Sequence, residues 1–158
     1  MYSEDEAAGL DAARRMFDAD KASAGLGIEL VEVAPGRAVA RMRVGAAMLN
    51  GHGIGHGGYV FLLADTAFAL ACNSRGPVTV AAGADVSFLA AVAEGDVLTA
   101  RAVERVVFGR SGIYDVTVTR GGAGGGVGGG ADREADVVGD GEQVVAEFRG
   151  RSRVVTGR

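Results

Sequence analysis

The chain has 158 residues, 48% of them hydrophobic, and a formal net charge of −4, so it can form one compact domain with a sizeable core. It has no basic run, which argues against a nucleic-acid partner, and we expect no signal peptide in its acidic first residues, which lack an apolar core. Residues 59–73 are apolar but too short for a membrane span. The single cysteine, Cys72, excludes an internal disulfide and lies in this apolar run, so we expect a core thiol. We therefore predict one cytoplasmic domain, residues 1–158, that binds neither nucleic acid nor a membrane.

The N-terminal segment predicts a helix and then a β-hairpin. Ser3 is placed to cap the helix and Glu6 to complete a capping box, and a thin apolar stripe continues to about Asp20. Residues 27–33 and 37–44 alternate between apolar and polar side chains, with an Ala-Pro-Gly turn between them. The arginines of the second strand share one side, which indicates a sheet with one wet face.

A buried helix is predicted at residues 58–73, because this segment is apolar on nearly every side. An Asn-Ser-Arg-Gly-Pro run at 73–77 ends it. Four later segments predict strands: 78–88, 97–107, 112–119 and 143–155. Their short links favour an antiparallel meander. The expected fold class is α+β, with a curved antiparallel sheet of about six strands around a central helix and an N-terminal helix outside it.

Residues 121–141 interrupt this pattern. The segment GGAGGGVGGGADREADVVGDG is largely glycine and has no periodicity, which predicts a flexible loop insertion. It separates two runs that would otherwise pair as a hairpin. A glycine-rich phosphate loop is the alternative, but the Lys-Ser/Thr that follows a P-loop is missing.

Asp65 is the one carboxylate of the central helix. Its helical neighbours three and four positions away are all apolar: Phe61, Leu62, Phe68 and Ala69. A carboxylate in such surroundings is costly unless it is satisfied or used. Two interpretations stay open. Asp65 is either hydrogen-bonded to backbone or to a hydroxyl such as that of Thr66, or it is held in a dry cleft as a general base or nucleophile with a raised pKa.

A loop rich in glycine and histidine, LNGHGIGHGG at 49–58, precedes this helix. The start of a helix presents free backbone N–H groups and the positive end of the dipole, a natural seat for an oxyanion or phosphate. Residues 53–58 match the dinucleotide fingerprint G-x-G-x-x-G, but no strand precedes them and no acid follows at the required distance. His52 and His56 have the spacing of helical zinc ligands, but they lie in a loop and lack a third ligand nearby. We predict no metal and no cofactor, a loop staple at His52, and a ligand-orienting role for His56.

Two motifs carry a resemblance to a known family. N-x-H-x-x-x-H-G-G starts at Asn50, and L-A-D-x-A-F-A-x-A-x-N-S-x-G runs from Leu63 to Gly76. Later blocks at 85–89, 95–100 and 109–116 extend the likeness. With these motifs the sequence resembles the hotdog-fold thioesterases of the PaaI type, the phenylacetic acid degradation thioesterases. The resemblance implies a hotdog fold paired across subunits, at least a homodimer and expected as a homotetramer. It also implies metal-free hydrolysis of acyl-CoA thioesters, with aryl-acetyl groups favoured.

The resemblance further implies roles for single residues. Asp65 corresponds to the catalytic carboxylate, Gly57 supplies an N–H to the thioester carbonyl, and Asn50 and His56 bind or orient at the same site. Further substrate contacts are expected at Gly58, Phe61, Leu62, Thr66 and Phe68, with the CoA moiety at Gly109, Arg110, Ser111 and Gly112.

Helix geometry then predicts a shared site. Asp65 follows Gly57 by eight residues, which separates them by roughly 12 Å along the helix axis. One carbonyl cannot contact both in a single chain, so Asp65 must come from a second subunit if both act on it. An acyl-CoA sensor or carrier without turnover is the alternative function, although a pure binder does not need the carboxylate. A hotdog hydratase is a further alternative, but no histidine follows Asp65.

Overall fold

A computed structural model describes residues 1–121, 137–138 and 141–155. The predicted insertion at 121–141 lies almost wholly outside these residues. In chain order the elements are the helices α1 (Glu4–Asp18) and α2 (Lys21–Gly25), the strands β1 (Glu29–Ala34) and β2 (Arg37–Arg43), the 3-10 turn η1 (Ala46–Met48), the helix α3 (Gly57–Asn73), and the strands β3 (Thr79–Phe88), β4 (Val97–Phe108), β5 (Ser111–Gly121), β6 (Val137–Val138) and β7 (Glu142–Val154).

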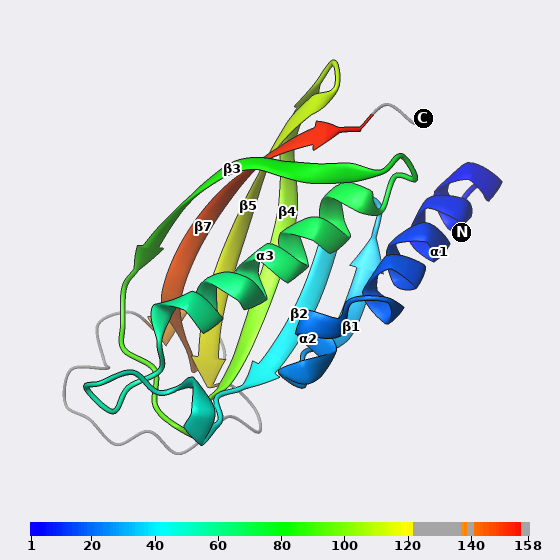
Figure 1. Ribbon diagram of the computed structural model, residues 1–158. Helices are drawn as coiled ribbons and strands as arrows, with labels where there is room; N and C mark the ends of the chain where they lie inside the picture. The colour runs from blue at the N-terminus through cyan, green and yellow to red at the C-terminus, as the bar shows by residue number, and fades with distance from the viewer. Residues whose placement is uncertain (122–136, 139–140, 156–158) are drawn as a thin grey trace.

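The strands form one antiparallel sheet in the order β1-β2-β4-β5-β7-β3, and β6 pairs with β7 beside this path. The sheet curves around α3, which lies across its concave side (Figure 1). The predicted α+β fold is therefore confirmed, and so is the pairing of the two strands that flank the insertion, β5 and β7.

The predicted meander is wrong at one strand, because β3 pairs with β7 and not with β4. Asn73, at the end of α3, explains the start of β3. Its Nδ2 donates to the Thr79 carbonyl at 2.9 Å, and its Oδ1 accepts from the Thr79 N–H at 3.0 Å. β3 returns alongside the helix as the edge strand, and the link at 89–96 crosses the end of the sheet to reach β4.

The N-terminal helix is confirmed with its capping box, in which Ser3 Oγ accepts from the Glu6 N–H at 3.1 Å and Glu6 Oε2 from the Ser3 N–H at 2.9 Å. It ends at Asp18, however, and the separate helix α2 was not predicted. Asp20 caps α2 by accepting from the Ser23 N–H at 2.9 Å. Aspartate is a strong N-cap, and here it starts a new helix where the apolar stripe suggested the end of the first.

The core lies between α3 and the sheet. Phe68 is 1% exposed, and its ring packs against those of Tyr114 and Phe148 at centroid distances of 5.6 and 5.8 Å. Cys72 is buried as predicted, and burial raises the pKa of its thiol to about 12, so it stays protonated at neutral pH. Within the described residues, the structure holds no helix both long and apolar enough to cross a membrane.

Candidate functional site

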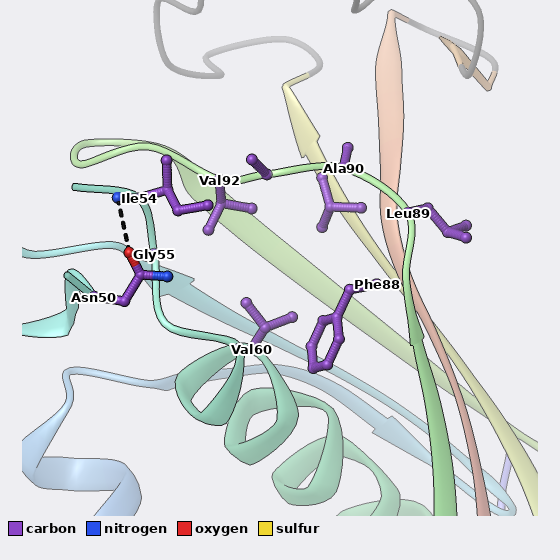
Figure 2. Close-up of a pocket in the computed structure, with 11 residues that line it drawn as sticks. Asn50, Ile54, Gly55, Val60, Phe88, Leu89, Ala90 and Val92 are labelled. Atoms are coloured by element: carbon purple, nitrogen blue, oxygen red, sulfur yellow. Dashed lines mark hydrogen bonds between the residues drawn. The ribbon is translucent and has the colours of Figure 1, made fainter. Parts of the chain in front are cut away.

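The loop before α3 is held closed by its own hydrogen bonds. The Asn50 N–H donates to the Ile54 carbonyl at 2.8 Å, and the His56 N–H donates to the Met48 carbonyl at 2.7 Å. The Asn50 side chain also accepts from two backbone N–H groups, that of His52 at 2.8 Å and that of Ile54 at 3.4 Å. Figure 2 shows the bond to Ile54. Asn50 is therefore the side chain that staples this loop, and His52 contributes its backbone N–H.

The N–H group of Gly57, the first residue of α3, is open among the described residues. His56 is the N-cap, and its Nδ1 accepts from the Gly58 N–H at 2.9 Å. The Gly57 N–H donates to no residue that the structure describes. It points out of the positive end of the helix dipole, where a developing oxyanion is stabilised. Because His56 occupies the Gly58 N–H, the predicted substrate contact of Gly58 cannot run through that group.

A pocket of about 460 Å³ opens at this end of α3. It is lined by Asn50, Ile54, Gly55, Gly57, Val60, Phe88, Leu89, Ala90, Ala91, Val92 and Val145. One side is the pocket wall, which we define as residues 88–92, the stretch that leaves β3 and passes over the first turn of α3 (Figure 2). Phe88 packs so closely that a Cβ on Gly57 would lie 2.9 Å from its Cζ. A mostly apolar pocket with a free N–H at its edge suits an acyl group whose carbonyl meets that N–H.

The sequence did not point to the pocket wall, because the acyl contacts were expected among side chains of the central helix. None of the five further contacts predicted on α3, Gly58, Phe61, Leu62, Thr66 and Phe68, lines the described pocket. Phe68 is a core side chain, and Phe61 packs edge-on against Phe148 at 5.3 Å. Leu62 is partly buried against the core, and the Thr66 hydroxyl is 2.9 Å from that of Ser23. The apolar run at 88–92, directly after a predicted strand, was the available signal.

The predicted CoA contacts lie elsewhere in the protomer. Gly109 and Arg110 form the turn between β4 and β5, and Ser111 and Gly112 are the first two residues of β5. This turn is at the opposite end of the sheet from the start of α3 (Figure 1). A single chain therefore does not bring these four residues to the Gly57 pocket.

Asp65 is a half-buried carboxylate in the middle of α3. It makes no hydrogen bond or ion pair to any described residue. Thr66, its suggested hydroxyl partner, contacts Ser23 instead, so that interpretation is wrong about the partner. Burial, and then the negative charge of Asp20, raise the pKa of Asp65. An unpaired carboxylate with a raised pKa is typical of a functional base. Asp65 does not line the pocket that holds Gly57, as the helix spacing predicts for one chain.

Possible metal ligands do not cluster in the part of the chain that the structure describes, where no three His, Cys, Asp or Glu side chains gather around a common point. The absence of a metal in the reaction remains a prediction, which an experiment below addresses.

Comparisons with known proteins agree with the motifs. The model of the thioesterase superfamily matches residues 52–126. The acyl-coenzyme A thioesterase PaaI of Escherichia coli is 38% identical over 145 residues, which cover 92% of this chain and 90% of that protein. The solved structure of E. coli PaaI, from the phenylacetic acid degradation operon, aligns over 98% of both chains with a TM-score of 0.80 and 35% identity. The TT0310 protein of Thermus thermophilus aligns over 86% of this chain and 98% of its own, with a TM-score of 0.71 and 34% identity.

Proposed function

The chain belongs to the thioesterase superfamily as a hotdog-fold acyl-CoA thioesterase of the PaaI type, and from that premise we propose how its residues cleave the thioester and which acyl group they take. The observation that carries the mechanism is the unoccupied Gly57 N–H at the start of α3, at the edge of a mostly apolar pocket.

In the proposed reaction, the thioester carbonyl accepts a hydrogen bond from the Gly57 N–H, and the dipole of α3 supports the negative charge that develops on its oxygen. Asp65 of the partner subunit removes a proton from water as the water attacks the carbonyl carbon, or attacks that carbon itself to form a mixed anhydride that water then cleaves. The carbon–sulfur bond breaks in either route. CoA leaves as a thiolate and is protonated, and the acyl group leaves as the acid.

The edge of the sheet supports a dimer that shares this site. β3 pairs with β7 on one side only and carries exposed apolar side chains, including Val80 at 48% and Phe88 at 54%. A long unpaired edge of this kind invites pairing with another chain. α3 runs alongside β3 in the opposite direction (Figure 1). Antiparallel pairing of two β3 strands would therefore set two α3 helices side by side, with each Asp65 turned toward the partner's Gly57.

Further assembly and location are proposed on separate observations. Exposed apolar residues near the end of β4, among them Val106, Val107 and Phe108, offer a second interface through which two dimers form a homotetramer. The single buried thiol of Cys72 supports a reducing, cytoplasmic compartment.

An aryl-acetyl group is the proposed acyl substituent. The E. coli relative comes from the phenylacetic acid degradation operon, and the pocket here presents the ring of Phe88 among small aliphatic side chains. An aromatic ring gains from edge or offset contact with another ring. A panel of acyl-CoA thioesters assayed for thiol release tests both the activity and the preference. Saturable acyl-CoA binding with no thiol release from any thioester would instead identify a sensor or carrier.

Chelators should leave thioester hydrolysis unchanged. The proposed mechanism uses a backbone N–H and a carboxylate, and among the described residues His52 and His56 have no further ligands with which to form a zinc site. The measurement is kcat/KM before and after prolonged EDTA treatment and dialysis. Lost activity that added zinc restores would show that the reaction needs a metal.

The fall of kcat/KM at acid pH should follow the protonation of Asp65. Burial and the charge of Asp20 raise the pKa of Asp65. The pH at which kcat/KM falls to half its maximum should therefore lie above ~3.9, the ordinary pKa of aspartate. Asp20→Asn keeps a good helix cap but removes the repelling charge, and should move the midpoint to lower pH. An unmoved midpoint in this variant would contradict the assignment.

The same shift has a consequence for stability. Between the unfolded and folded pKa values of Asp65, the folded state holds a proton that the unfolded state has released. The free energy of unfolding therefore falls as the pH rises through that interval. At neutral pH, Asp65→Asn should be more stable than the wild type, and the difference should shrink in acid. Chemical denaturation at a series of pH values measures it.

A further inference from the structure

The pocket wall is not part of a regular strand beyond Phe88, so other contacts must hold its shape. The N–H groups of Leu89 and Ala90 donate to the Val145 carbonyl at 2.8 and 3.3 Å, and the Gly55 N–H donates to the Val92 carbonyl at 2.7 Å. Between these attachments, the Ala91 carbonyl accepts a hydrogen bond from Nη1 of Arg120. The middle of the wall is thus held by a side chain from the end of β5.

Arg120 is 6% exposed, and its guanidinium joins three segments. Besides Ala91, its Nε donates to Gln143 Oε1 at 2.8 Å, with a second bond from Nη2, and its Nη1 lies 3.2 Å from Asp96 Oδ2. Asp96 is itself 3% exposed and accepts from the Ala93 N–H at 2.9 Å, just beyond the wall. A planar, permanently charged fork suits several acceptors that must keep fixed relative positions.

We infer that Arg120 is a positioning residue for the acyl pocket. Its guanidinium bonds to the Ala91 carbonyl, Asp96 and Gln143 at the same time, which fixes the pocket wall and so sets which acyl groups fit. This inference rests on the proposed function, in which the wall contacts the acyl group. Gly57 and Asp65 lie on α3, which has its own attachments. Movement of the wall should therefore change acyl selectivity more than the chemical step.

The test compares Arg120→Lys with a matched control, Arg101→Lys. A lysine at 120 keeps a positive charge for Asp96, but one ammonium group cannot reproduce the fork that joins Gln143 and Ala91. Arg101 binds the neighbouring pair, Thr119 at 3.1 Å and Glu142 at 3.0 Å, but its side chain is exposed and these bonds do not reach the wall. Both variants remove an arginine fork at the same end of the sheet.

The readout is kcat and KM for phenylacetyl-CoA and acetyl-CoA, measured by thiol release. Arg120→Lys should lower the ratio of kcat/KM for phenylacetyl-CoA to kcat/KM for acetyl-CoA about tenfold. The change should come mainly from a higher KM for phenylacetyl-CoA, because the fit of the acyl group in its pocket gives selectivity of this size. Arg101→Lys should keep the wild-type ratio. A folded Arg120→Lys protein with the wild-type ratio would overturn the inference.

A second variant and the wild-type activity distinguish failure of the Arg120 role from failure to fold and from failure of the proposed function. Should Arg120→Lys fail to fold, Gln143→Leu removes two bonds of the fork and leaves the buried Arg120–Asp96 pair in place. An unchanged ratio in that variant equally overturns the inference. A wild-type protein that releases no thiol from either thioester would refute the proposed function, whereas an active wild type with unresponsive variants refutes only the role of Arg120.

Discussion

Replacement of Asp65 by asparagine should lower kcat by about a hundredfold or more, the loss that follows removal of a catalytic acid–base group. The protein should stay folded, because Asp65 has no hydrogen bond or ion pair to lose among the described residues and asparagine has nearly the same shape. Steady-state kinetics on the best thioester of the panel, with circular dichroism for the fold, measure both effects.

The control is Asp20→Asn, which removes the neighbouring carboxylate that also acts on Asp65. Asp20→Asn also replaces a carboxylate by an amide, at a residue near Asp65. It should shift the pH profile of kcat/KM without abolishing turnover. Near-normal kcat in folded Asp65→Asn protein would remove Asp65 from the mechanism and leave its burial as a structural feature.

Two inactive variants should restore each other when they form a mixed dimer. Asp65→Asn removes the base, and Gly57→Pro removes the polarising N–H. The local backbone accepts the proline, because position 57 begins the helix and His56 is extended with φ −67° and ψ 130°. In a mixed dimer with a twofold axis, one site carries both lesions and the other carries neither. Random pairing makes about half of the dimers mixed, so roughly a quarter of all sites should recover.

Gly57→Ala is the matched control for the proline variant. It meets the Phe88 ring at the same place, since a Cβ there lies 2.9 Å from Cζ, but it keeps the N–H. It should retain far more activity than Gly57→Pro, which separates crowding of Phe88 from loss of the donor. If heterodimers verified by native mass spectrometry show no recovery, Gly57 and Asp65 act within one chain or not together.

Local pattern accounts for most of what was predicted correctly. The apolar run of α3, the hairpin of β1 and β2, and the capping box at Ser3 each depend on residues close in sequence. The absence of a charged partner for Asp65 among its neighbours on the helix could be read from the sequence in the same way. The repelling charge of Asp20 could not, because 45 positions separate the two residues and only the packing of α2 on α3 brings them together.

The incorrect predictions concern residues whose partners are far away in the chain. The order of the strands depends on the long-range pairing of β3 with β7, which no local pattern in the sequence reveals. The pocket wall passes over Gly57 from a segment that begins 31 residues later in the chain. Phe68, one of the acyl contacts expected on the central helix, is a core side chain. The catalytic roles of Asp65, Gly57, Asn50 and His56 remain predictions for the experiments above.

The pocket draws its free N–H group and its wall from separate segments: the N–H comes from the start of α3, and the wall comes from the end of β3 and the link to β4. Substitutions in the link can therefore reshape the cavity while the helix keeps its register. Such a division lets a lineage acquire new substrates by drift in a surface segment, with the reaction itself under continuous selection. For a protein engineer, Ala90 and Ala91 are the natural positions for a focused library, because each is small and each lines the cavity.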